Sequence, residues 1–557
     1  MNSQQISFFS LTPIVKTRFF IEKRIHYLQK LKLFTTRKRI LSIILLVAVY
    51  LAFEFVQTPE ISAFCADTTS YLNLSPYRQP MYGMWANGIH LLSGSWRVVT
   101  MLQVAAFVAF AAWVLVELAL ISNLGMLSAL IFVVAMLAYS RLGLLQTVWC
   151  LRSEGLFYPM IMLTAAMFLT WIRTWRTSFL IGLVLIIIGM TQVRSDALLL
   201  PAVPVFAAIC VLTAQAKRRS ANARSAVLTL ATVVIGLVFM PPLLGKSVMQ
   251  VGTDADSLGF AILPRVSLLP LSPVIGNRSP EWTAMSSSWR AAAGQLDIVA
   301  LTQFDAQLQE AIRYYLGPKI LAAILNRSPK DVEEEYGLAV SCVFLKPEDF
   351  AIHPGSSRGW PPPLCHSANF NDAKHKALEW ILDEWPSYMR LSGTHLWGML
   401  TMANFMDNGD REEVWKALNA VSILTWRYAP RYAPSTSEYP LDHIYKRLKW
   451  STNAFFVLIR WSSIVVLIIG IVSAISALIQ LRTNRVIPRG ILAIAFAVGW
   501  SIAHSIPAAL FVYPDSRFTF ANMLMMLSGV AAWLAYLGRN GMFSPASGGG
   551  DTAKLLV

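Results

Sequence analysis

Residues 97–121 read RVVTMLQVAAFVAFAAWVLVELALI, a run in which Glu117 is the only charged residue after Arg97. This run is long enough to cross a membrane, because about 20 helical residues span the ~30 Å hydrocarbon core. Further apolar runs occur near 40–57, 125–140, 154–172, 178–193, 197–214, 225–245, 454–481, 490–512 and 518–538, of which 125–140 and 178–193 are short. The sequence therefore predicts an α-helical polytopic membrane protein with about ten transmembrane helices.

The composition agrees with a membrane protein. Of the 557 residues, 55% are hydrophobic and 14% are charged, whereas soluble proteins carry about 25% charged residues. The net charge of +16 is uneven, since residues 1–39 hold nine Lys and Arg and only one acid, Glu22. A basic block before a first span is typical of a cytoplasmic N-terminus, so we expect no nucleic-acid partner.

The distribution of basic residues predicts the topology. If the N-terminus is cytoplasmic, every second connection should be cytoplasmic and rich in Lys and Arg. These connections contain Arg173, Arg176, Lys217, Arg218, Arg219, Arg224, Arg482, Arg485, Arg489 and Arg539, and only the turn at 122–124 lacks a basic residue. The pattern fits ten spans with both termini in the cytoplasm, and eleven or twelve spans stay compatible with it.

A long polar interval separates the two groups of spans. Residues 246–453 hold 22 of the 31 acidic residues and 20 basic ones. Apolar residues recur at helical spacing in 301–325, 372–392 and 410–426, so we expect one large, mainly α external domain. Five cysteines without a CxxC pair argue against a zinc site, whereas Cys342 and Cys365 could pair if their region faces an oxidising compartment, or stay unpaired and buried.

These boundaries define five predicted regions. They are a basic cytoplasmic segment (1–39), a first transmembrane module (40–245, with its first external loop at 58–96), the external domain (246–453), the C-terminal transmembrane helices (454–538) and a flexible cytoplasmic tail (539–557).

Charged residues gather at the predicted outer ends of the spans. The basic ones are Arg78, Arg97, Arg141, Arg152, Arg194 and Arg517, and the acidic ones are Glu54, Glu60, Asp67, Glu154, Asp196 and Asp515. Interfacial snorkelling explains any single one of them. Because ionisable groups near the apolar slab tend to pair or to line a site, the whole set predicts a shared polar pocket.

Four local patterns lie on this side. The first pattern covers 64–82 and has two parts. FCADTTSY at 64–71 places Asp67 after the first span, and RQPMY at 78–82 predicts an Arg-x-Pro-x-Tyr turn with Arg78 and Tyr82. LRSEGLF at 151–157 contains Arg152 and Glu154. VRSDALL at 193–199 contains Arg194 and Asp196, and YPDSRF at 513–518 contains Arg517.

In this order the four patterns resemble those of the GT-C class of glycosyltransferases, of the protein mannosyltransferase and aminoarabinose transferase type. The resemblance covers residues 60–200 and 510–520, and does not include the external domain. In the class a second acid often stands beside the first-loop Asp, whereas here Thr68 follows Asp67. The late Arg-Tyr turn of the class is Arg-Phe in this chain.

The resemblance implies an inverting hexosyl- or pentosyltransferase. It would move a sugar from a polyprenyl-phosphate donor to a glycan, lipid or protein acceptor on the non-cytoplasmic face of a bacterial inner membrane. Asp67 is then the expected general base, because glycosyl transfer to a hydroxyl needs a proton acceptor. Arg78, Arg194 and Arg517 are candidate phosphate ligands, since the guanidinium fork binds phosphate oxygens bidentately.

The remaining site residues complete the expected pocket. Tyr82, Arg152, Glu154 and Asp196 would line it, with the two acids orienting the arginines or the sugar. No cofactor is expected, and a requirement for a divalent metal ion stays open.

Two other classes of protein fit parts of the pattern. A polysaccharide polymerase or ligase would also use outer-face arginines and a large external loop. A transporter is disfavoured, because its charges and helix breaks usually lie near the bilayer midplane, whereas these span centres are almost wholly apolar. The absence of a P-loop motif also argues against an ATP-driven pump.

Overall fold

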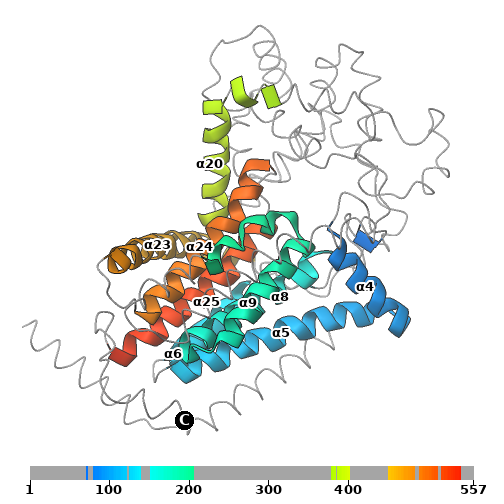
Figure 1. The fold of residues 1–557 in the computed structure, drawn as a ribbon, viewed down its shortest axis with the longest axis horizontal. Coiled ribbons are helices and arrows are strands. Elements are labelled where there is room, and N and C mark those ends of the chain that lie inside the picture. Colours follow the sequence, from blue (N-terminus) through cyan, green and yellow to red (C-terminus); the bar gives the residue numbers. More distant parts are fainter. Residues whose placement is uncertain are drawn as a thin grey trace, which may run out of the picture.

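The computed structural model describes residues 71–72, 79–121, 125–139, 148, 151–205, 378–379, 381–383, 385–401, 449–482, 488–511 and 516–540. Within these ranges every regular element is a helix and there is no strand (Figure 1). The elements are α4 (Pro80–Ser93), α5 (Trp96–Ile121), α6 (Gly125–Tyr139), α8 (Glu154–Thr174), α9 (Thr177–Val193), η2 (Ser195–Leu199, a 3-10 helix), α20 (Trp385–Thr401), α23 (Lys449–Arg482), α24 (Arg489–Phe511) and α25 (Ser516–Asn540).

Seven of the helices coincide with predicted spans, and this confirms the helical class of the protein. Five helical stretches are long and apolar enough to cross a membrane: α5, α8, and the greater parts of α23, α24 and α25. The helices α6 and α9 are apolar but shorter, as their runs predicted. The predicted spans at 40–57 and 225–245 lie outside the described residues, and only the first part of 197–214 is described.

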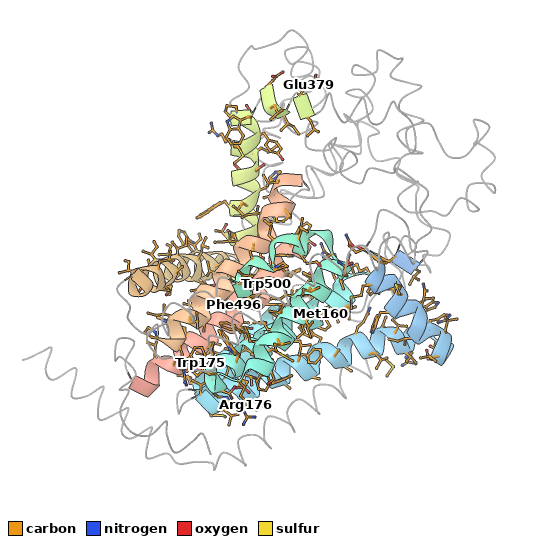
Figure 2. All side chains as sticks on the ribbon, viewed as in Figure 1. Met160, Trp175, Arg176, Glu379, Phe496 and Trp500 are labelled. Atoms are coloured by element: carbon orange, nitrogen blue, oxygen red, sulfur yellow. The ribbon has the colours of Figure 1, made fainter. Side chains whose placement is uncertain are left out.

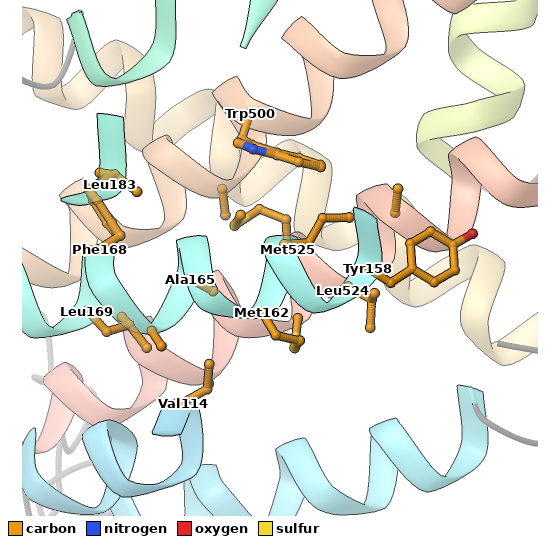
Figure 3. Close-up of a cluster of buried hydrophobic side chains, with 14 of the residues drawn as sticks. Val114, Tyr158, Met162, Ala165, Phe168, Leu169, Leu183, Trp500, Leu524 and Met525 are labelled. Atoms are coloured by element: carbon orange, nitrogen blue, oxygen red, sulfur yellow. The ribbon is translucent and has the colours of Figure 1, made fainter. Parts of the chain in front are cut away.

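The bundle is built around α8. This helix packs against α5, α9, α24 and α25, and 78% of its most apolar stretch is buried. Figure 3 shows Tyr158, Met162 and Leu169 along α8, facing side chains that come from the neighbouring helices. The rings of Phe168 on α8 and Phe496 on α24 stack at 3.7 Å. Since close-packed apolar side chains define one arrangement, this core fixes the relative positions of the helices that carry polar groups.

By contrast, α23 lies at the edge of the bundle. Only 28% of its most apolar stretch is buried. Its exposed large apolar side chains are Trp461, Val465, Ile468, Ile471, Val472, Ile475, Leu478 and Ile479. A continuous apolar face of this extent suits contact with lipid and not with water.

Ion pairs mark the two ends of the bundle. At one end Arg173 donates from Nε and Nη2 to Glu117 at 2.5 and 2.9 Å, and the Arg489 guanidinium lies 5.6 Å from the Trp175 ring. Figure 2 shows Trp175 and Arg176 at this same end. Glu154 begins α8 at the opposite end, and Arg173 follows it by 19 positions in the helix, a rise of about 28 Å. This length is close to the ~30 Å thickness of a hydrocarbon core.

The sequence prediction of a turn at 78–82 is wrong in part. Pro80 occupies the first position of α4, so Tyr82 lies in the first turn of a helix. Proline suits this position, because its fixed φ is helical and its missing N–H has no partner there in any case. The helix ends at Gly94, whose φ of 70° is in the left-handed region, where glycine is favoured.

The helix α20 lies within the stretch predicted to form the external domain. It begins within the predicted helical stretch 372–392 but continues to Thr401 and packs against α23, α24 and α25. The Tyr388 hydroxyl donates to the Leu510 carbonyl oxygen at 2.6 Å, and Leu400 packs against Leu467, Val498 and Met526.

These contacts give the direction of α20. It runs antiparallel to α24 for twelve residues, or about 18 Å, from the Glu154 end of the bundle inward. The end of α20 is therefore part of the bundle, as Figure 1 also shows. Of the other predicted boundaries, 453/454 falls within α23 and 538/539 within α25, whereas 39/40 and 245/246 lie outside the described residues.

Candidate functional site

Arg194 is the centre of a buried charged cluster at the Glu154 end of the bundle. It caps α9 in an extended conformation and precedes η2, so its side chain turns back toward the start of α8. Its Nη1 donates to Glu154 Oε1. Its Nε donates to both carboxylate oxygens of Asp196, at 2.9 and 3.1 Å. The side chains of Arg194, Glu154 and Asp196 are 10%, 2% and 6% exposed, so their charges are stabilised by one another and not by water.

Two phenylalanines enclose the guanidinium. Its Cζ atom lies 5.4 Å from the ring centre of Phe157 on α8 and 5.1 Å from that of Phe518 on α25. Both separations are within the range at which a cation is attracted to an aromatic face. The rings and the two carboxylates together fix the plane of the Arg194 fork.

His504 and Asn522 extend the cluster into the bundle, and sequence reasoning missed both. His504 Nε2 lies 3.1 Å from Asp196 Oδ2, although its N–H direction is poorly aligned with that oxygen. His504 Nδ1 lies 3.1 Å from Asn522 Oδ1. The imidazole stacks on Phe157 and Trp500, with ring centres 5.4 and 5.1 Å apart. A histidine inside a predicted span is the signal that could have found this contact, because ionisable residues there are rare and tend to be functional.

The second oxygen of Glu154 is also occupied. Ser153 Oγ lies 3.2 Å from Glu154 Oε2 and 2.8 Å from the Tyr71 hydroxyl. Arg152 Nε lies 3.6 Å from the same Glu154 oxygen. Within the described residues this buried Arg152 Nε makes no hydrogen bond. Tyr71 therefore ties the first predicted external loop to the start of α8.

Tyr82 is connected to the cluster through Tyr71. Its ring contacts the Tyr71 ring edge-on at 5.4 Å, and its hydroxyl accepts a hydrogen bond from Gln103 Nε2 at 2.9 Å. Burial raises the pKa of Tyr82 well above its ordinary value. The phenol is therefore neutral at physiological pH.

The charge state of Asp196 is set by its neighbours. Burial by itself would raise the pKa of this carboxyl, but the charge of Arg194 and the approach of His504 outweigh burial and hold the pKa below its ordinary value. Asp196 consequently stays ionised at neutral pH and is a weak proton acceptor.

Of the eight residues that the sequence predicted for the site, four come together in the cluster: Arg152, Glu154, Arg194 and Asp196. Arg517 lies in the first turn of α25, next to Phe518. Asp67 and Arg78 lie outside the described residues. In the part of the chain that the structure describes, no three His, Cys, Asp or Glu side chains are placed to hold a metal ion.

One donor nitrogen of Arg194, Nη2, has no partner among the described residues. The other donor nitrogens of this guanidinium are held by carboxylates. Arg194 Nη1 and Arg152 Nε lie at the two oxygens of Glu154. A guanidinium N–H of this kind is chemically suited to hold an anion by a charge-assisted hydrogen bond.

The described residues thus form a helical bundle of membrane-spanning type, with an arginine–carboxylate cluster buried at one end. Comparisons of the chain with protein-family models, with curated proteins and with solved structures find no match. Its function is therefore argued from the chemistry of the cluster.

Proposed function

We propose that the protein is a membrane glycosyltransferase of GT-C-like type, which transfers a sugar from a polyprenyl-phosphate donor to an acceptor on the non-cytoplasmic face. The observation that carries the proposal is the clasp of Arg194 by Glu154 and Asp196 between Phe157 and Phe518. Three of the four sequence patterns that resemble the class contribute side chains to this arrangement.

The leaving group accounts for the arginines. A polyprenyl phosphate leaves as an anion, so its departure needs cationic stabilisation and no proton donor. Arg194 offers Nη2, Arg152 lies beside the same Glu154 carboxylate, and neither guanidinium loses its charge at physiological pH. The two carboxylates would hold Arg194 in place before the donor arrives, so that little reorganisation is needed in the transition state.

The general base is proposed to be Asp67. Glu154 is poorly suited, because Arg194 binds one of its oxygens while Ser153 and Arg152 lie at the other. Asp196 is poorly suited because the pKa of its carboxyl is lowered. Tyr71 follows Asp67 by four residues in the sequence, and its contact with Ser153 supports a position of the first loop near the cluster.

The same proposal includes the membrane arrangement. About ten spans would leave both termini in the cytoplasm and residues 246–453 outside, in a bacterial inner membrane. The positive-inside pattern supports this topology, as does the separation of about 28 Å between the ion pairs at the two ends of α8.

A topology reporter tests the arrangement. A reporter that is active only outside the cytoplasm, fused near Ser356, is expected to be active. Fusions near Arg219 and Arg485 should be inactive with this reporter and active with a cytoplasmic one. Cytoplasmic reporter activity at Ser356 would contradict the topology and, with it, the proposed site of transfer.

A transporter is the second candidate, because His504 and Asn522 extend the polar cluster into the bundle. A polysaccharide polymerase or ligase would differ from the proposed enzyme in needing a lipid-linked glycan as its substrate. Both alternatives predict that a simple polyprenyl-phosphate sugar is not consumed.

The deciding experiment supplies radiolabelled polyprenyl-phosphate sugars to the purified protein in lipid nanodiscs. Membrane extract provides the acceptor, and label is followed from the lipid fraction into the acceptor. We expect consumption of at least one donor by the wild type, and loss of this consumption in Arg194→Lys. Consumption that is equal in the wild type, in Arg194→Lys and in boiled protein would overturn the proposal.

A further inference from the structure

The end of α20 reaches deep into the bundle. Leu400 packs against Val498, which precedes His504 by six residues on α24, or about 9 Å. Polar groups at this depth are costly unless they are paired, because water is excluded. One polar contact joins α20 to the bundle here.

Asn522 of α25 provides this contact. Its Nδ2 donates to the Met399 carbonyl oxygen at 3.4 Å and to Ser505 Oγ at 2.7 Å. A carbonyl oxygen only accepts, so the amide nitrogen must face Met399 and the amide oxygen must face His504. The orientation of the Asn522 side chain is thus fixed by its chemistry.

This orientation determines which contacts the two ring nitrogens of His504 make. Nδ1 must donate to Asn522 Oδ1, while Nε2 faces Asp196 Oδ2 at 3.1 Å. The imidazole therefore lies between the Asn522 amide and the Asp196 carboxylate, with one of them at each ring nitrogen.

We propose that Asn522 and His504 are positioning residues that couple the seating of α20 to the placement of Asp196 and Arg194. The connection runs from the Met399 carbonyl through Asn522 and His504 to Asp196, and every step is a contact of 3.4 Å or less. It joins a segment of the 246–453 stretch to the charged cluster. The segment that is proposed to lie outside the membrane can therefore act on the anion site without touching it.

Hydrogen exchange tests the coupling without any assumption about the reaction. Asn522→Leu keeps the branched shape and the number of heavy atoms of the side chain and removes all three of its polar contacts. In the full-length protein in nanodiscs we expect exchange to become about ten-fold faster at the end of α20, at the Ala197 amide of η2 and at the Leu200 amide that caps η2. Peptides around Glu117 and Arg173, at the far end of the bundle, should keep their wild-type rates.

Two further variants separate coupling from local damage. His504→Phe keeps the stacking on Phe157 and Trp500 but removes both nitrogens, so exchange should rise at η2 and stay unchanged in α20. Ser528→Ala is the matched control, because Ser528 is buried on the same helix and, among the described residues, donates only to the Leu524 carbonyl oxygen of that helix. It should leave both segments unchanged.

Three results for Asn522→Leu would each overturn the coupling. They are faster exchange confined to α20, unchanged exchange in both segments, and a uniform rise in the exchange rate through the whole bundle. A kinetic readout rests in addition on the proposed function. There, Asn522→Leu should raise KM for the donor about ten-fold with a smaller change in kcat. An absence of turnover in the wild type would reject the proposed function and leave the exchange result standing.

Discussion

Replacing Arg194 by methionine is expected to destabilise the bundle by about 3–5 kcal/mol and to abolish binding of an anionic donor. The guanidinium is the shared partner of Glu154 and Asp196, which are 2% and 6% exposed. Removal of one partner from a buried ion pair leaves an uncompensated charge, which accounts for the expected destabilisation. Unfolding in detergent measures the stability, and titration with farnesyl phosphate measures the affinity.

Arg173→Met is the matched control at the other end of the bundle. Arg173 binds Glu117 through two hydrogen bonds, and the Glu117 side chain is 4% exposed. We expect this variant to lose stability by a comparable amount but to keep the wild-type affinity for farnesyl phosphate. If both variants lose the same affinity, Arg194 is a structural anchor and the anion site must be sought elsewhere.

Arg194→Lys refines the test. A lysine keeps the positive charge, but one ammonium group cannot reproduce the planar fork that reaches Glu154 through Nη1 and Asp196 through Nε. From the sequence alone this variant should lose turnover at near-normal expression. The structure adds a loss of stability, because one of the two buried carboxylates would lose its hydrogen bond.

Asp67→Asn is expected to lower turnover by about 10²–10⁴-fold, the usual contribution of a general base. Asparagine keeps the size and part of the hydrogen bonding of the side chain but cannot accept the proton of the acceptor hydroxyl. Donor affinity should change little, since the phosphate is proposed to be held by arginines. The measurement is kcat and KM for donor consumption in nanodiscs.

Glu60→Gln serves as the control for Asp67→Asn, because it removes a carboxylate from the same predicted loop. It should retain wild-type kcat. Full activity of Asp67→Asn would remove the catalytic assignment. Because the structure commits both oxygens of Glu154, another carboxylate of the loop, such as Glu60, would then be the next candidate.

The apolar runs predicted the helices because the stretch of chain that is apolar enough to lie in lipid is the same stretch that forms the helix. The structure begins α5 at Trp96 and α8 at Glu154, within a residue of the predicted starts. The start of α4 was missed because an Arg-x-Pro pattern suits a turn as well as the first position of a helix. Tertiary contacts, such as that of Tyr82 with Gln103, decide between the two.

The cluster was predictable in part. Arg194 and Asp196 are two residues apart, so their pairing is local, and Glu154 carries a charge at the start of an apolar run. His504 and Asn522 were missed because they are polar residues inside runs that otherwise satisfy every criterion for a span. The packing of α20 was missed for the opposite reason. Its polar residues, including the buried Ser387, Ser392 and His395, are typical of a helix in water.

The order of the chain has a consequence for biosynthesis. The ribosome delivers α20 before α23, α24 and α25, the three helices that it packs against. Until α25 has left the ribosome, the Met399 carbonyl has no Asn522 to bind and Arg194 has no Phe518 beside it. The helices of the first half can insert one by one during translation, but the cluster is complete only after α25 has emerged. Premature termination before residue 516 should therefore yield helices in the membrane in which Arg194 lacks Phe518 and α20 lacks Asn522.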